Sequence, residues 1–140
     1  MQRQQLEAQL SDADTPMDFR KAKQIGAEIG ADYEPLVFGQ GYDHNWALNG
    51  EGYRPAVEMY SDKTGIRMEI KTDLPGVQFY SGNFLTGEPG KDGAYYKKRS
   101  GVCFETQYFP DAIHHEAFVS PVLEKDKEFT SVTAYCFGER

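Results

Sequence analysis

Residues 54–72 read RPAVEMYSDKTGIRMEIKT, and this stretch decides the fold class of the 140-residue chain. In its second half, apolar residues alternate with charged ones. This two-residue period is typical of a β-strand that packs one face against the core and exposes the other to solvent. Its centre, residues 61–65, is polar and contains glycine, as hairpin turns do. The sequence therefore predicts that strands 54–60 and 66–72 pair as a β-hairpin.

Similar short stretches, rich in aromatic and β-branched residues, recur between clusters of Gly, Pro, Asn and Asp. This pattern is typical of an all-β sandwich or barrel. The other strands expected are 45–48, 77–81, 101–108 and 129–137. The last of them carries apolar residues on both faces and is expected to be covered on both sides. We expect a helix only over residues 2–10 and a long glycine-rich loop over residues 86–99.

Composition narrows the class of function. The net charge is −7 and the pI is near 4.9, so no partner with a phosphate backbone, such as nucleic acid, is expected. The basic run at residues 97–99 is interpreted as the solvated edge of a strand. The two cysteines, Cys103 and Cys136, have the spacing of neither a metal site nor a disulfide framework, which favours a reducing compartment.

The length fits one domain of ordinary size. The first ten residues lack the apolar core of an export signal, and nowhere do eighteen apolar residues run together. We therefore expect a cytoplasmic protein with no membrane partner. If the N-terminus is truncated, a signal peptide could have been lost, so this alternative is kept.

Residues 101–111, GVCFETQYFPD, place one carboxylate inside a run of apolar and aromatic residues. On a strand, Glu105 shares a face with Cys103 and Gln107, while Phe104 points to the other face. A carboxylate in partly apolar surroundings is suited to taking and returning protons. Glu105 is therefore the candidate base, and the alternative is an ordinary surface glutamate of a strand.

Four motifs, read together, resemble those of a known protein family. They are GYDHNW at 41–46, LPGVQFYSGNF at 74–84, KDG at 91–93 and GVCFETQYFPD at 101–111, in the order found in galactose mutarotases. The chain resembles the C-terminal part of an aldose 1-epimerase over roughly residues 15–137. Residues 1–14 are set apart as an unmatched N-terminal segment, and residues 15–140 as the C-terminal portion of an aldose 1-epimerase-like β-sandwich domain.

The resemblance implies an antiparallel β-sandwich of the galactose mutarotase type, of which the chain holds a part. Such enzymes interconvert the α and β anomers of hexoses such as galactose or glucose by proton transfer and ring opening. By resemblance, Glu105 is the general base, while Asp43 and Gln78 bind the sugar. The scheme requires no cofactor, and a bound Ca²⁺, as in some bacterial relatives, stays open.

The residues themselves leave other interpretations of the two sugar contacts. Asp43 follows a glycine and can equally form an Asx turn that caps the backbone. Gln78 can equally be a strand residue that faces water. Phe79 and Tyr80 can flank a sugar, although core packing is expected for at least one of them.

The family's acid is a histidine from an N-terminal half that this chain lacks. The three histidines here lie outside that motif: His44 is interpreted as structural, and His114 and His115 as part of a surface loop. A truncated or split gene product, a fragment, and a chain that completes its site with another copy all stay open. The protein partners expected are therefore a second copy or a missing N-terminal half. The alternative function is a non-catalytic carbohydrate-binding remnant.

Overall fold

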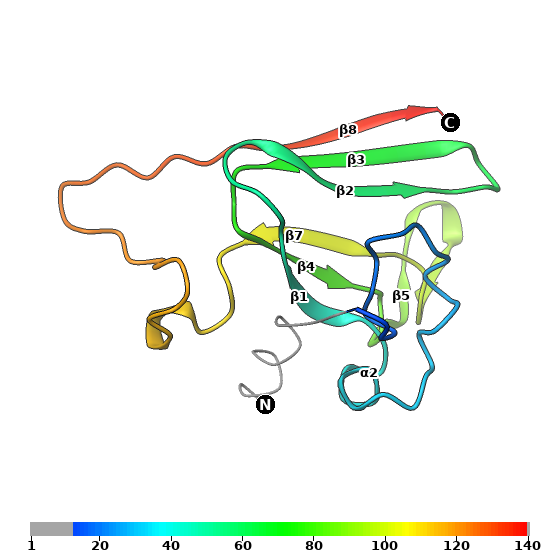
Figure 1. The fold of residues 1–140 in the computed structure, drawn as a ribbon. Helices are drawn as coiled ribbons and strands as arrows, with labels where there is room; N and C mark the ends of the chain where they lie inside the picture. Colours follow the sequence, from blue (N-terminus) through cyan, green and yellow to red (C-terminus); the bar gives the residue numbers. More distant parts are fainter. Residues whose placement is uncertain (1–12, 140) are drawn as a thin grey trace. The chain divides into compact units, whose positions relative to one another are not determined.

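The computed structural model describes residues 13–139, and it is all-β in class as expected (Figure 1). Its elements in chain order are α2 (Glu34–Gly39), β1 (Asp43–Ala47), β2 (Arg54–Tyr60), β3 (Ile66–Thr72), β4 (Gly76–Tyr80), β5 (Thr86–Pro89), a 3-10 turn (Lys91–Gly93), β6 (Tyr95–Lys97), β7 (Cys103–Gln107), a second 3-10 turn (Ala112–His114) and β8 (Thr133–Glu139). The strands form three sheets with the orders β1-β4-β7, β2-β3-β8 and β5-β6.

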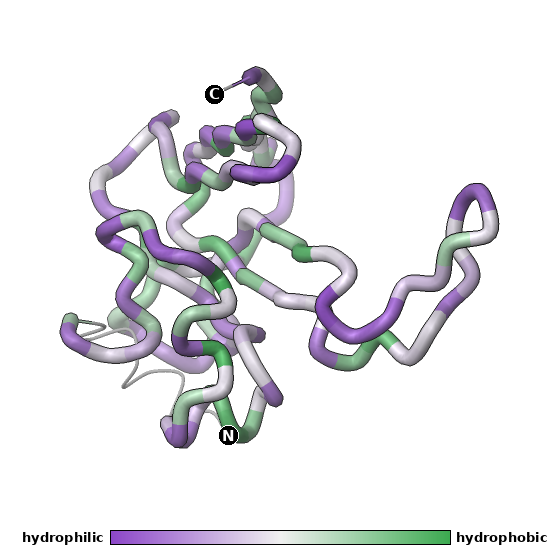
Figure 2. The backbone as a smooth tube through the Cα atoms, turned by 90° about the vertical axis from the view of Figure 1, so that its right-hand side faces the viewer, coloured by the Kyte–Doolittle hydropathy of each residue, from purple (hydrophilic) through white to green (hydrophobic). Residues whose placement is uncertain are grey.

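The chain divides into two compact units. One runs to Trp46 and resumes over Gln78–Glu105, and the other comprises Ala47–Val77 and resumes at Thr106. Apolar and polar residues alternate in short stretches along the chain, as strands with two different faces require (Figure 2). Within residues 13–139, no helix has both the length and the apolar character needed to cross a membrane.

The second unit contains the predicted hairpin. β2 and β3 pair antiparallel with the boundaries expected from the sequence, and the Ser61 N–H donates to the Ile66 carbonyl across the turn at 2.9 Å. Met68 and Ile70 of β3 are buried, so the alternating pattern marks the packed face correctly. Ile66, at the start of β3, is exposed. On the wet face, Arg67 forms an ion pair with Glu58.

β8 corrects the expectation for residues 129–137. Its strand covers Thr133–Glu139 and pairs antiparallel with β3, which places Phe137 opposite Met68 and Tyr135 opposite Ile70. Most of β8 is exposed rather than covered on both sides. The physical reason is that β8 is an edge strand of its sheet, so its side chains have a neighbouring strand on one side only.

The core of the first unit lies on one face of the β1-β4-β7 sheet. Its buried members are Met17, Leu36, Tyr42 and Phe79. The ring of Phe79 stacks on Phe104 of β7 with centroids 4.8 Å apart, and on Tyr42 with centroids 5.3 Å apart. Stacked aromatic pairs at such distances add to the free energy gained from burial alone. The segment before α2 and α2 itself therefore cover this face.

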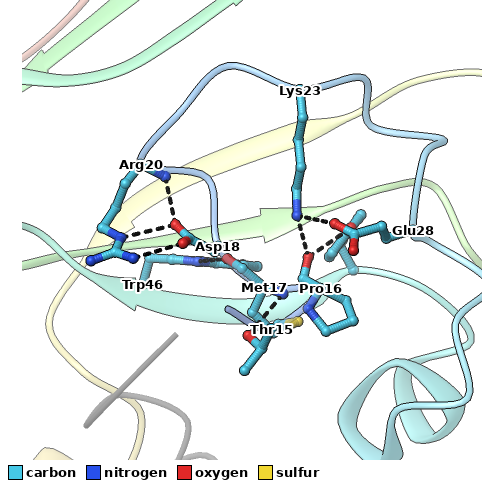
Figure 3. Close-up of polar contacts among 9 residues, drawn as sticks. Thr15, Pro16, Met17, Asp18, Arg20, Lys23, Glu28 and Trp46 are labelled. Atoms are coloured by element: carbon cyan, nitrogen blue, oxygen red, sulfur yellow. Dashed lines mark hydrogen bonds and ion pairs between the residues drawn. The ribbon is translucent and has the colours of Figure 1, made fainter. Parts of the chain in front are cut away.

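Polar contacts fix the segment before α2 to the core (Figure 3). The indole Nε1 of Trp46 donates to the Met17 carbonyl at 3.0 Å. Lys23 Nζ donates to the Pro16 carbonyl at 2.8 Å and pairs with the Glu28 carboxylate at 2.5 Å. These bonds satisfy carbonyls that have no strand partner, so an irregular segment can cover the sheet.

Two elements differ from the sequence-based expectations. α2 was not expected, because six residues are too short to display a helical period. Residues 86–99 contain the β5-β6 hairpin, with Thr86 opposite Lys97 and Pro89 opposite Tyr95. Its strands lack apolar alternation, and this made the segment resemble a loop. The helix expected over residues 2–10 lies outside the described residues.

Candidate functional site

The register of β1 against β4 decides which side chains meet. The Ser81 N–H donates to the Tyr42 carbonyl, and the Leu48 N–H donates to the Pro75 carbonyl, each at 2.9 Å. Both bonds give the same antiparallel register. It makes Asn45 and Gln78 direct cross-strand neighbours, at a position without backbone bonds between them, where side chains approach most closely.

The aromatic core defines which face each side chain occupies. Phe79, Phe104 and Trp46 contact one another on the core face, with Trp46 and Phe79 centroids 5.9 Å apart. Side chains alternate along a strand, so the neighbours of these aromatic residues point to the opposite face. The opposite face, called the polar face below, carries Asp43, Asn45, Gln78, Tyr80, Cys103 and Glu105.

Two of the predicted sugar-binding residues are joined directly. The Gln78 amide donates from Nε2 to Oδ1 of Asp43 at 2.9 Å. Asp43 is the first residue of β1 and not part of an isolated turn. Both side chains are half-buried, and Oε1 of Gln78 is buried without a hydrogen-bond partner among the described residues. A fixed carboxylate beside an amide with a vacant acceptor suits a ligand that carries hydroxyl groups.

Glu105 lies on β7, and β4 separates it from β1 in the strand order. It belongs to the polar face because its neighbour Phe104 stacks on Phe79. Its side chain is exposed, as is that of Cys103, so residues 13–139 do not enclose it in apolar groups. The exposed surroundings differ from the expected pocket wall. The assignment of Glu105 as a base stays a prediction.

Asn45 was not singled out from the sequence. It is 8% exposed, and both its Oδ1 and its Nδ2 are buried without a hydrogen-bond partner among the described residues. Buried polar atoms in folded proteins normally have a hydrogen-bond partner, so Asn45 is an exception. The available signal was its position two residues after Asp43, which places both on one face of a strand.

His44 occupies the opposite, core face and is held at both ring nitrogens. The Asp43 N–H donates to Nδ1 at 3.0 Å, and Nε2 lies 3.1 Å from the Pro35 carbonyl. This pattern requires the neutral ring with its proton on Nε2. Burial lowers the pKa of His44, against the opposing effects of the Pro35 carbonyl and the Asp43 charge. The geometry agrees with the interpretation of His44 as structural.

A second polar cluster holds the ends of β1 and β4. Asn83 donates to the carbonyls of Gly39 and Tyr42, at 2.7 and 2.9 Å, and accepts from Ser81 Oγ at 2.7 Å. Arg99 also donates to Asn83 and Ser81. The basic run at residues 97–99 is therefore more than a solvated edge, because one of its side chains anchors the polar cluster.

The remaining histidines lie in the second unit. His114 bonds to Asp111, and this bond holds the pKa of Asp111 below its usual range. His115 Nε2 lies 3.4 Å from the same carboxylate. Within the described part of the chain, no three His, Cys, Asp or Glu side chains are grouped so that they can hold a metal ion.

Comparisons with known proteins agree with the motifs. The family model described as aldose 1-epimerase matches residues 6–136. Human galactose mutarotase is 37% identical over 126 residues, which are 89% of this chain and 35% of the human protein. The aldose 1-epimerase of Escherichia coli strain K12 is 35% identical over 129 residues, which are 89% of this chain and 37% of that protein.

A solved structure shows the same fold. The crystal structure of a GalM/aldose epimerase homologue from C. elegans matches with a TM-score of 0.79 at 28% identity, covering 92% of this chain and 38% of that one. The chain spans little more than a third of the length of the curated relatives it matches. The resemblance found in the four motifs is thereby confirmed, and the chain belongs to the aldose 1-epimerase family.

Proposed function

We propose that the polar face of the β1-β4-β7 sheet binds a hexose and takes part in the interconversion of its α and β anomers. One observation carries this proposal: Gln78 donates to Asp43 at 2.9 Å on the face that also presents Glu105. Membership of the aldose 1-epimerase family supports the reaction class. Because similar proteins include human galactose mutarotase, galactose is the first sugar to test.

In this mechanism Glu105 acts as the general base. It takes the proton of the C1 hydroxyl while an acid protonates the ring oxygen, the bond between C1 and the ring oxygen breaks, and an open-chain aldehyde results. Rotation about the C1–C2 bond and closure with the proton transfers reversed give the other anomer. Asp43 and Gln78 hold sugar hydroxyls during these steps, since a carboxylate accepts and an amide both accepts and donates.

His44 does not supply the acid. It points to the core face, and its Nε2 is engaged by the Pro35 carbonyl. This observation favours a second candidate function, in which the chain binds a hexose without turning it over. The two functions share a sugar-binding face and differ only in proton transfer.

Polarimetry on freshly dissolved α-D-galactose separates the two functions. If the chain is a catalyst, the rate exceeds that of a matched buffer blank, and Glu105→Gln lowers the enzymatic rate by about 10²–10⁴-fold because the base is lost. Glu51→Gln, which removes the same charge from an exposed loop position, is the control and is expected to keep the rate.

Binding is measured in parallel by ligand-observed NMR with D-galactose and D-glucose. Binding without a rate above the blank supports the non-catalytic function. A rate that Glu105→Gln leaves unchanged contradicts the assignment of the base. Absence of both binding and rate contradicts the proposal as a whole.

A further inference from the structure

We propose that Asn45 is a positioning residue of the sugar site: it takes over the Gln78 amide when a sugar hydroxyl occupies Asp43. The inference rests on the proposed sugar-binding function and assigns a role to a residue that the motifs did not mark. Its basis is the set of unpaired amide atoms on the polar face. Oε1 of Gln78 and both polar atoms of Asn45 are buried without partners among the described residues.

The register of β1 against β4 places the side chains of Asn45 and Gln78 next to each other. Asn45 and Gln78 are direct neighbours across β1 and β4, and such pairs have Cβ atoms about 4.5–5.5 Å apart. Asp43 is the diagonal neighbour of Gln78 and already accepts its Nε2 proton at 2.9 Å. The Gln78 amide therefore has two polar neighbours on β1, Asp43 and Asn45, and it forms a hydrogen bond with Asp43.

The chemistry of the two neighbours suggests an exchange. Oδ1 of Asp43 accepts from Gln78, while the donor and the acceptor of Asn45 have no partner within residues 13–139. A sugar hydroxyl that donates to Asp43 Oδ1 competes with the Gln78 amide. The displaced amide can then pair with Asn45, whose Nδ2 donates and whose Oδ1 accepts. Binding thereby gives a partner to buried groups that have none in the part of the chain that the structure describes.

This arrangement separates the requirements of folding and binding. Unpaired buried polar atoms destabilise a free protein, and their replacement by an apolar side chain of similar shape is neutral or stabilising. We therefore expect Asn45→Leu to unfold at the same temperature as the original chain or at a higher one. Its Kd for D-galactose is expected to rise about tenfold or more, because the displaced Gln78 amide loses its second partner.

The decisive readout is the side-chain amide signals in a ¹⁵N NMR spectrum of the 140-residue chain titrated with D-galactose. The inference predicts that the signals of Asn45 Nδ2 and Gln78 Nε2 shift together as the sugar binds. In Asn45→Leu the Gln78 signal is expected to follow a different course. Asn45→Thr, which keeps a donor and an acceptor, is expected to recover part of the affinity. Asn49→Leu, an exposed position after β1, is the matched control and is expected to change neither the affinity nor the side-chain amide signals of Asn45 and Gln78.

Several outcomes overturn the inference. One is equal galactose affinity in Asn45→Leu and the original chain, and another is a Gln78 signal that stays fixed while the sugar binds. A fall in the unfolding temperature of Asn45→Leu with unchanged affinity also overturns it, since the residue is then structural. Galactose binding without turnover refutes only catalysis and leaves this inference to be judged on the binding data. A chain that binds neither galactose nor glucose refutes both proposals.

Discussion

Asp43 and His44 are adjacent in β1, but their side chains lie on opposite faces of the sheet and have different roles. Asp43 points to the polar face and accepts from Gln78, whereas His44 points to the core face and bonds to the Pro35 carbonyl. The alternation of a strand separates them. A histidine beside a predicted site aspartate therefore contributes to packing.

The pH dependence of stability is expected to report the buried state of His44. Its pKa in the folded chain lies below the ordinary value of 6.5, because burial disfavours the charged ring. Below pH 6.5 the unfolded chain binds more protons than the folded one, so the free energy of unfolding falls as the pH falls. The slope from this one group is at most about 1.4 kcal/mol per pH unit.

Urea unfolding between pH 7.5 and 5.5 checks this expectation. His44→Gln keeps a donor and an acceptor but does not titrate, so its stability is expected to change less over the same range. His114 and His115 are present in both proteins and cancel in the comparison. Equal pH dependence in the two proteins contradicts the assignment.

At the scale of elements, the polar cluster of Ser81, Asn83 and Arg99 fixes the ends of β1 and β4. Asn83 is 3% exposed and donates to the carbonyls of Gly39 and Tyr42, the second of which also accepts the backbone N–H of Ser81. The cluster also explains a glycine: a Cβ on Gly41 would clash with the Arg99 guanidinium and would lie 2.6 Å from Oδ1 of Asn83. The positive φ of 133° at this position further disfavours other residues.

Asn83→Ala is expected to lower the free energy of unfolding by about 1–3 kcal/mol for each buried partner left unpaired. Chemical denaturation measures the loss. Asn49→Ala, at an exposed position, is the control and is expected to stay within about 0.5 kcal/mol of the original chain. A similar small change in Asn83→Ala would mean that the cluster does not hold the strand ends.

At the scale of the whole molecule, the second unit leaves an apolar face open at its edge. Phe137 of β8 is opposite the buried Met68 but is itself 71% exposed. Edge strands with exposed apolar side chains favour association with further strands. We therefore propose that this edge of β8 pairs with a second copy of the chain.

Sedimentation velocity over a concentration series tests this self-association. The chain is expected to self-associate in 0.15 M salt, where its net charge of −7 is partly screened. Phe137→Lys is expected to weaken the association. Cys136→Lys adds the same charge to the opposite face of β8 and is expected to have a smaller effect. Equal sedimentation of all three proteins as monomers contradicts self-association through this face.

Features that depend on neighbours along the chain could be predicted from the amino-acid sequence. Alternation and a polar turn predicted β2 and β3 with their boundaries, and the motifs identified the family. These features can be predicted from the sequence because the period of a strand and the residues of a turn are local properties. The same motifs marked Asp43, Gln78 and Glu105, whose functional roles stay predictions.

Features that depend on partners distant in sequence became visible in the folded chain alone. The short helix α2, the β5-β6 hairpin and the exposure of β8 follow from packing and strand order. The pairing of Asn45 with Gln78 follows from a register 33 positions apart in sequence, which no local pattern records. Physically, a residue's own side chain sets its preference for a strand, but its neighbours across the sheet determine whether its polar atoms find partners.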